Sequence, residues 1–396
     1  MRRKRSRIAW SLGLITVFLL ASEAAVRYFQ AAVPPPADAG FVDDPATGFR
    51  LKPSSRTDTP ATTDLYVNAA GFRDAPLPAA KPPGVFRVVA LGDSHVAGGA
   101  PAAETFLDQA AEQAAARAPA GAAVEIVKLG CPGWQTEHET GALRAVGLPL
   151  APDLVVLCFC VGTDISGRAE EPRVIQGNLH FVGMYDVWLN ALRKSRLFVL
   201  GEQVYLWRVM KRVRGTLARL DALAHRLRGR APAPTGTARL ATDARTNTEI
   251  SREYARVVRR RLPMYETTPP DWLERYWRDG LAALADFDAV CREAGVPWLL
   301  LVVPDEIQID PAVRRAALAR LGRDPAGVDP DLPRRRLAAW AAAHDVAILD
   351  PTAELRAATL AHGPQYLVNN PHWNADGSRL VGRLLAGAIL RRLSPS

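Results

Sequence analysis

Short continuous apolar runs alternate with longer, alanine-rich stretches along most of the chain after residue 85. The runs lie at residues 86–91, 124–129, 154–161, 298–303 and 346–349. A continuous apolar run of this length is typical of a strand in a parallel sheet, where helices cover both faces. We therefore predict that these five runs form a buried parallel sheet.

The stretches between the runs have helical character. They lie at residues 105–117, 137–145, 272–294 and 332–344, followed by a final segment at 376–393. The final segment carries arginines near its end, which favours a helix C-terminus. Strands that alternate with helices in this way predict a doubly wound α/β fold.

A long insertion at about 166–270 interrupts this alternation. Residues 193–230 hold eleven Lys or Arg and two acids, and apolar positions recur at three- and four-residue steps. This pattern predicts an amphipathic basic helix, which either packs on the domain with a solvated face or forms a lid or membrane-surface element. We interpret residues 231–238 as a flexible linker and residues 245–261 as a further helical segment.

The N-terminus combines positive charge with an apolar segment. Five of the first seven residues are Arg or Lys. The apolar run at residues 8–26 is close to the ~20 residues that cross a bilayer. We predict that the charges hold the N-terminus in the cytoplasm and that the rest is exported. The segment is either an uncleaved anchor or a signal peptide cut after Ala24, and the aromatic and basic residues at 26–29 favour the anchor.

Residues 30–84 are rich in Pro, Gly and Ala and show little helical periodicity. Gly-Phe-Arg occurs twice there, beginning at Gly48 and at Gly71. We predict an irregular or short-stranded collar. The predicted domains are thus a membrane anchor or signal segment at 1–29, this collar, and an α/β domain at 85–396 that contains the insertion.

Composition narrows the function classes. The chain is 48% hydrophobic, which suffices for a sizeable core, and its net charge is +9. It contains no zinc finger, RNA-recognition signature or basic region with heptads, so we expect no nucleic-acid partner. Its four cysteines include no C-x-x-C pair and are expected to be buried free thiols. The histidines lack metal-ligand spacing, so we expect neither a metal nor a cofactor.

The first predicted strand ends in Gly92-Asp93-Ser94. Ser94 then lies at the carboxyl edge of the sheet, where open α/β sheets bind their ligands. The motif is either an ordinary strand-terminal turn or the display of a catalytic nucleophile.

Four segments in order favour the nucleophile: FRVVALGDSHVAGG, VEIVKLGCPGWQT, PDLVVLCFCVGTDI and NNPHWNADG. Together they resemble the SGNH or GDSL hydrolase superfamily, most closely its membrane-anchored bacterial branch, over residues 48–393 apart from most of the insertion. The resemblance implies a flavodoxin-like three-layer sandwich with a parallel five-stranded sheet. It also implies Ser94 as nucleophile and His372 as general base. Gly133 and Thr163, which stands where the family usually has Asn, would form the oxyanion hole.

The acid of the triad departs from the family pattern. The family places Asp two or three residues before the histidine, and this chain has Asn370 and Asn369 there. An Asn cannot stabilise an imidazolium by charge and can favour the wrong tautomer. Three possibilities are open: a Ser–His dyad oriented by a backbone carbonyl, a carboxylate supplied by Asp350 or Asp305, or loss of most hydrolytic activity. His95, beside Ser94, can shape the pocket.

The resemblance implies an exported, membrane-anchored serine esterase or acyltransferase. Its expected substrates are acyl esters, O-acetyl esters first among them, of cell-surface carbohydrate. We predict a single-pass protein of the bacterial inner membrane whose catalytic domain is periplasmic or otherwise extracytoplasmic. The alternative is a catalytically impaired envelope protein that keeps the scaffold for binding or assembly. The sequence names no protein partner.

Overall fold

The structure, a computed structural model, describes residues 2–32, 40–55, 66–78, 80–98, 105–119, 123–165, 172–175, 178–181, 197–198, 201 and 249–393. The chain divides into two compact units. One consists of Met1–Asp38 and Phe181–Thr237, and the other of Ala39–His180 and Ala238–Ser396. The second unit contains every residue of the candidate site. The domain bounds predicted from the sequence stay a prediction.

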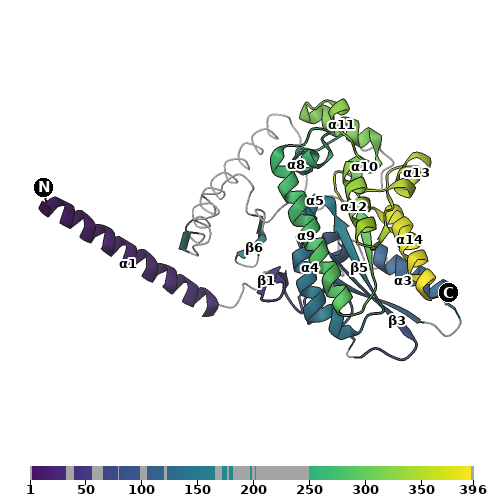
Figure 1. Cartoon of the computed structure of the whole chain (residues 1–396), viewed down its shortest axis with the longest axis horizontal. Coiled ribbons are helices and arrows are strands. Elements are labelled where there is room, and N and C mark those ends of the chain that lie inside the picture. Colours follow the sequence, from purple (N-terminus) through teal and green to yellow (C-terminus); the bar gives the residue numbers. More distant parts are fainter. Residues whose placement is uncertain are drawn as a thin grey trace, which may run out of the picture. The chain divides into compact units, whose positions relative to one another are not determined.

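Five parallel strands form the central sheet of the second unit (Figure 1). They are β3 (Val85–Gly92), β4 (Ala123–Gly130), β5 (Leu154–Cys160), β8 (Trp298–Val303) and β9 (Ala347–Leu349). The order β4-β3-β5-β8-β9 is that of a flavodoxin-like sheet. The predicted parallel sheet is confirmed, because each apolar run coincides with a strand to within one residue. Ligands bind such sheets where the strand order reverses, which is here between β3 and β5.

Successive strand residues point to opposite faces of the sheet. Because most of these residues are apolar on both faces, helices cover both. Val88 and Ala90 belong to the core under α3 (Phe106–Arg117), α13 (Thr352–His362) and α14 (Ala375–Leu393). The opposite face is covered by α4 (Thr136–Ala142), a π-helical turn (Leu143–Gly147), α9 (Asp271–Glu293) and α12 (Leu332–Ala343). On that face the Trp298 ring contacts Phe287 of α9 and Trp340 of α12. The predicted three layers and the five predicted helices of the α/β domain are confirmed.

Several short elements follow the strands at their carboxyl ends. They are α2 (Ser94–Ala97) after β3, α5 (Val161–Asp164) after β5, and α10 (Glu306–Ile309) after β8. The chain then forms α11 (Pro311–Leu321) and a 3₁₀ turn (Pro325–Gly327). Neither α11 nor α13 is predicted from the sequence.

The insertion is only partly helical where the structure describes it. β6 (Pro172–Ile175) and β7 (Asn178–Phe181) form a two-stranded sheet, so the prediction of a helical insertion is wrong there. α8 (Arg252–Arg261) and a 3₁₀ turn (Leu262–Tyr265) confirm a helix within residues 245–261. The basic helix predicted at 193–230, apart from residues 197–198 and 201, and the linker at 231–238 lie outside the described residues.

The collar contains a short hairpin. β1 (Phe41–Asp44) pairs antiparallel with β2 (Gly48–Leu51), so the short-stranded form of the prediction is confirmed. The two Gly-Phe-Arg segments lie together, because the Arg50 side chain donates to the carbonyl of Ala70 at 2.9 Å.

The N-terminal segment of the first unit forms one helix, α1 (Arg2–Ala32). Over the residues that the structure describes, no helix combines the length and the apolar character that crossing a membrane requires. The membrane segment at 1–29 stays a prediction from the sequence.

Candidate active site

Ser94 begins α2 directly after β3 ends. Asp93 caps this helix, and its side chain accepts a hydrogen bond from the backbone N–H of His95. The glycine at the end of the neighbouring strand lets α2 approach, because a Cβ on Gly130 would lie 2.4 Å from the backbone nitrogen of Ala97. The Gly-Asp-Ser turn thus presents Ser94 at the carboxyl edge of the sheet.

His372 reaches Ser94 from the loop that precedes α14. The distance from His372 Nε2 to Ser94 Oγ is 2.8 Å, and that from His372 Nδ1 to Asn370 Oδ1 is 2.6 Å. The backbone N–H of His372 also donates to Asn370 Oδ1, at 3.1 Å, which fixes the amide with its oxygen toward the ring. Nδ1 therefore carries the proton, and Nε2 is left with the lone pair that accepts from Ser94. Asn370 holds the tautomer that a general base needs.

Asn369 has a different place. Its Oδ1 accepts from the backbone N–H of Ser251 at 2.8 Å, and its Nδ2 donates to the carbonyl of Glu249 at 2.9 Å. Its φ of +54° is left-handed, a conformation that Asn tolerates better than most residues. Of the two candidate residues, Asn370 contacts His372, and Asn369 ties the loop to the chain before α8.

The two carboxylates suggested as substitutes for the missing acid are engaged elsewhere. Asp305 pairs with Arg261 and accepts from the Tyr265 hydroxyl at 2.6 Å. Asp350 accepts from Arg334 at 2.7 Å and from the backbone N–H of Thr352, the first residue of α13, at 3.0 Å. Neither reaches His372, so the hypothesis that Asp305 or Asp350 completes the triad is wrong.

A second histidine lies against the first. His95 Nδ1 is 2.9 Å from Asp93 Oδ1, and His95 Nε2 is 3.3 Å from the carbonyl oxygen of Pro371. The rings of His95 and His372 have centroids 4.7 Å apart. The sequence predicts no role for Asp93 in the site. The signal is present all the same, since Asp93-x-His95 has the same spacing as Asn370-x-His372.

These contacts set the charges of the site. Burial raises the pKa of the Asp93 carboxyl, but the charge and hydrogen bonds of His95 outweigh burial and leave this pKa well below its usual value. Burial and the neighbouring His95 lower the pKa of His372 to about 3, and the charge of Asp93 offsets this only in part. His372 is therefore unprotonated at neutral pH and available as a base, although a weak one.

Gly133 lies in a tight turn after β4. Trp134 N donates to the carbonyl of Cys131 at 3.1 Å, Pro132 occupies the second position, and Gly133 has a φ of +85°. This is the pattern of a type II turn, which requires a glycine at the third position. The collar supports the turn, because the Trp134 indole donates to the carbonyl of Phe49 at 2.8 Å.

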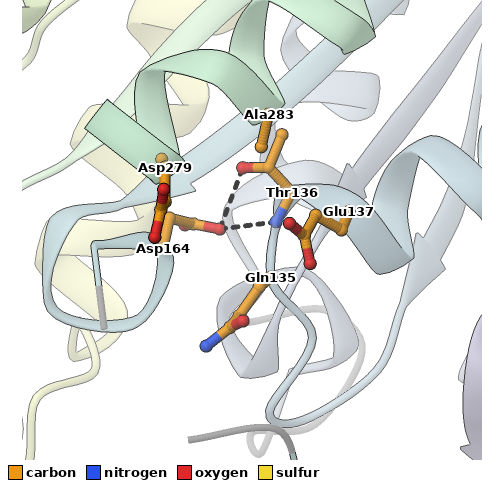
Figure 2. A pocket seen from close by; sticks show the side chains of 7 residues that line it. Gln135, Thr136, Glu137, Asp164, Asp279 and Ala283 are labelled. Atoms are coloured by element: carbon orange, nitrogen blue, oxygen red, sulfur yellow. Dashed lines mark hydrogen bonds between the residues drawn. The ribbon is translucent and has the colours of Figure 1, made fainter. Parts of the chain in front are cut away.

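The residues after this turn are tied to α5, which follows β5. Figure 2 shows the Asp164 carboxylate accepting from both the backbone N–H and the hydroxyl of Thr136, at 2.9 and 3.1 Å. The loops that carry Gly133 and Thr163 are thereby held to each other. A place for Gly133 in the oxyanion hole stays a prediction.

The Thr163 hydroxyl has a partner of its own. It donates to Asp93 Oδ2 at 3.0 Å, so its single proton is committed to that carboxylate. Thr163 would donate to an oxyanion only after breaking this bond, and its predicted role in the oxyanion hole stays a prediction.

Two further carboxyl groups lie beneath the site. Glu139 is fully buried, and neither of its carboxyl oxygens has a hydrogen-bond partner among the described residues. Burial, and then the charges of Asp164 and Asp93, raise the pKa of Glu139 well above its usual value. Burial likewise raises the pKa of Asp164. Burial thus favours the uncharged form of Glu139, and the charge of the neighbouring Asp93 adds to this effect.

Asp93, His95 and Cys160 each offer one potential ligand atom, all within 4.8 Å of one another. Two of these atoms are already joined in the Asp93–His95 hydrogen bond. Burial raises the pKa of the Cys160 thiol, which disfavours the thiolate that a metal would require. The cluster is explained without a metal. All four cysteines are buried and free, as predicted.

No family model and no curated protein matches the chain. Solved structures do. A lipase/acylhydrolase from Enterococcus faecalis is 15% identical, with a TM-score of 0.36 over 78% of this chain and 98% of that one. A catalytic mutant of an acetylxylan esterase from Geobacillus stearothermophilus is 12% identical, with a TM-score of 0.37 over 78% and 95%. A GDSL-like lipase from Bacteroides thetaiotaomicron is 13% identical, with a TM-score of 0.32 over 78% and 89%.

The chain is similar to GDSL-type acylhydrolases. The TM-scores are all below 0.4, so the chemistry is argued from the site alone.

Proposed function

We propose that the chain is a serine ester hydrolase with Ser94 as nucleophile and His372 as general base. The observation that carries this proposal is the 2.8 Å contact between Ser94 Oγ and His372 Nε2, on a ring whose tautomer Asn370 fixes. A serine and a histidine in this relation are the minimum for acyl transfer through a covalent intermediate.

In the proposed reaction, Ser94 Oγ attacks the ester carbonyl while His372 Nε2 takes its proton. The charge on the carbonyl oxygen is stabilised by backbone N–H groups at Ser94 and Gly133. Ser94 is the first residue of α2, so its N–H has no acceptor within that helix. His372 then returns the proton to the leaving alcohol, and water releases the acyl group by the same steps.

A second candidate is favoured by the charge of the site. Asn370 carries none, and the pKa of His372 is lowered to about 3, so the imidazolium formed during attack is poorly stabilised. This favours a catalytically impaired protein that binds ligands on an esterase scaffold.

Hydrolysis of p-nitrophenyl acetate by the full-length protein separates the two candidates. For the esterase we expect activity that is lost in both Ser94→Ala and His372→Ala and retained in His362→Ala, which changes an exposed histidine of α13. Labelling of Ser94 by a fluorophosphonate gives a second readout. Absence of both hydrolysis and labelling, or activity that persists in Ser94→Ala, would refute the esterase.

The finer predictions belong to the same proposal. A sugar hydroxyl in place of water would make the protein an O-acyltransferase, and O-acetyl esters of cell-surface carbohydrate are the expected substrates. Supplying glycan acceptors to the acyl-enzyme tests this, since transferred acyl groups appear on the glycan. A location in the bacterial inner membrane rests on the N-terminal sequence, and cell fractionation tests it.

A further inference from the structure

The outer face of α8 carries a row of arginines. Tyr254, Val258 and Arg261 of this helix are buried, whereas Arg252, Arg256 and Arg259 are exposed. The exposed arginines recur at steps of four and three residues, so they share one face of the helix.

Arg320 of α11 completes a groove with this face. The groove has a volume of about 370 Å³ and is lined by Arg252, Ala255, Arg256, Arg259, Arg320 and Leu321. Within the described part of the chain, none of its four arginines makes an ion pair or a hydrogen bond to another side chain. Four like charges that face one groove without a counter-charge repel one another, and an anion there would relieve the repulsion.

α8 is tied to both loops of the candidate active site. Ser251, which caps the helix, donates its backbone N–H to Asn369 at 2.8 Å, three residues before His372. At the other end, Arg261 lies so close to Gly162 that a Cβ there would be 2.3 Å from its Nε. The helix that forms one wall of the groove therefore also contacts the segments that carry His372 and Thr163.

The shape of the row indicates the kind of anion. Arg259 lies seven positions after Arg252, which is about 10 Å along the helix axis at 1.5 Å per residue. One carboxylate or phosphate cannot engage a row of this length, but a chain with repeated charges can. The lining contains no aromatic ring on which a nucleobase would stack, and only Ala255 and Leu321 are apolar. Guanidinium groups match carboxylates in bidentate geometry.

We propose that this groove binds an acidic polysaccharide through its carboxylates. If the groove binds such a chain, the substrate of Ser94 is an O-acylated acidic polysaccharide rather than a neutral one. This consequence rests on the proposed function.

Binding is tested first with polygalacturonate that carries no esters, using the full-length protein and affinity electrophoresis. We expect binding by the wild type, at least 10-fold weaker binding by Arg256→Gln/Arg259→Gln, and weaker binding by Arg320→Gln on the other helix. Arg383→Gln is the matched control, because it removes the same charge from an exposed position on α14. Dextran should not bind. Circular dichroism verifies that each variant is folded.

Three results would overturn the proposal. They are no binding of polygalacturonate by the wild type, equal binding by the groove variants and the control, and a preference of the same arginines for phosphatidylglycerol vesicles or for an oligonucleotide.

Measurements of activity distinguish the proposed groove from the proposed esterase function. We expect Arg256→Gln/Arg259→Gln to raise KM for O-acetylated polygalacturonate about 10-fold, with no change for acetylated xylan or p-nitrophenyl acetate. If the wild type hydrolyses no ester, the proposed function fails, while the binding arm still decides whether the groove takes an acidic polysaccharide.

Discussion

Two histidine pairs of the same construction lie side by side at the carboxyl edge of the sheet. In each, one side-chain oxygen accepts from the backbone N–H and from Nδ1 of the histidine two residues later. The distances are 2.9 and 2.9 Å for Asp93 and His95, and 3.1 and 2.6 Å for Asn370 and His372. The pairs differ in charge and in what the far ring nitrogen contacts. The carboxylate serves His95, which faces the carbonyl of Pro371, and the amide serves His372, which faces Ser94.

The two pairs separate two functions that an acid combines in a serine triad. One is to hold the tautomer and orientation of the ring, and the other is to stabilise the imidazolium by charge. Asn370 supplies the first, because the backbone N–H of His372 orients its amide. The second is supplied only indirectly, by Asp93 across the ring of His95. The candidate site therefore has the geometry of a triad without its charge.

Asn370→Asp gives His372 a carboxylate partner like that of His95. We expect it to have the largest effect on the rate. In a serine-protease triad the reverse exchange costs about 10⁴ in rate, part of which comes from a wrong tautomer. Since the tautomer is already correct here, we expect kcat/KM for p-nitrophenyl acetate to rise about 10²-fold. A carboxylate favours the imidazolium and raises the pKa of His372 from about 3, so the acid limb of kcat/KM should move to higher pH.

Asn369→Asp is the matched control. It makes the same exchange one residue earlier, at a side chain that contacts Ser251 and Glu249 rather than His372. We expect no gain in rate and no shift of the acid limb. A gain in Asn369→Asp that equals the gain in Asn370→Asp would refute the assignment of Asn370.

His95→Gln removes the ring that links the two pairs. It loses the contact with Pro371 and the packing against His372, so we expect kcat to fall about 10-fold through poorer placement of the base. His95 also lowers the pKa of His372, so the acid limb should move to higher pH although the rate falls. A variant that had merely lost folded protein would lower the rate without moving the limb. A fall without a shift would therefore contradict a positioning role for His95.

The strands of the sheet and the short elements around it differ in how far the sequence predicts them. The five strands are predictable because a strand covered on both faces is a continuous apolar run rich in Val, Leu and Ile, whereas the comparable run in α12, residues 337–343, is mostly alanine. Helix α13 was missed because it follows β9 after only Asp350 and Pro351. The short strands β6 and β7 carry no strong apolar pattern of their own.

The site was predictable to the extent that it depends on residue type. Ser94 and His372 were predicted, and the structure brings them together. Which of Asn369 and Asn370 faces the histidine was not predictable, because it depends on a left-handed φ at Asn369 and on Ser251, 118 positions earlier. The contact of the Thr163 hydroxyl with Asp93 likewise joins two loops that only the folded sheet brings together.

Glu139→Gln tests the negative charge of Asp93, which distinguishes the Asp93–His95 pair from the Asn370–His372 pair. Its effect, on the pH dependence of stability, is the smallest that we expect. The ionised Asp93 helps to raise the pKa of the buried Glu139, whereas in the unfolded chain Glu139 ionises near its ordinary value of 4.5. Between these two pKa values the folded state binds one more proton than the unfolded state. The free energy of unfolding therefore falls as pH rises above 4.5, by up to about 1.4 kcal/mol per pH unit for one proton.

Because Gln cannot ionise, Glu139→Gln should remove this contribution, leaving that of Asp164, whose pKa burial also raises. Urea unfolding at several pH values measures it: we expect the variant to match the wild type near pH 4 and to exceed it increasingly toward pH 8. Glu112→Gln, at an exposed position of α3, should leave the wild-type slope unchanged. Equal slopes in the wild type and Glu139→Gln would mean that Glu139 is ionised in the folded protein. Asp93 would then not be the one charged carboxylate that distinguishes the Asp93–His95 pair, because a second negative charge would lie at Glu139.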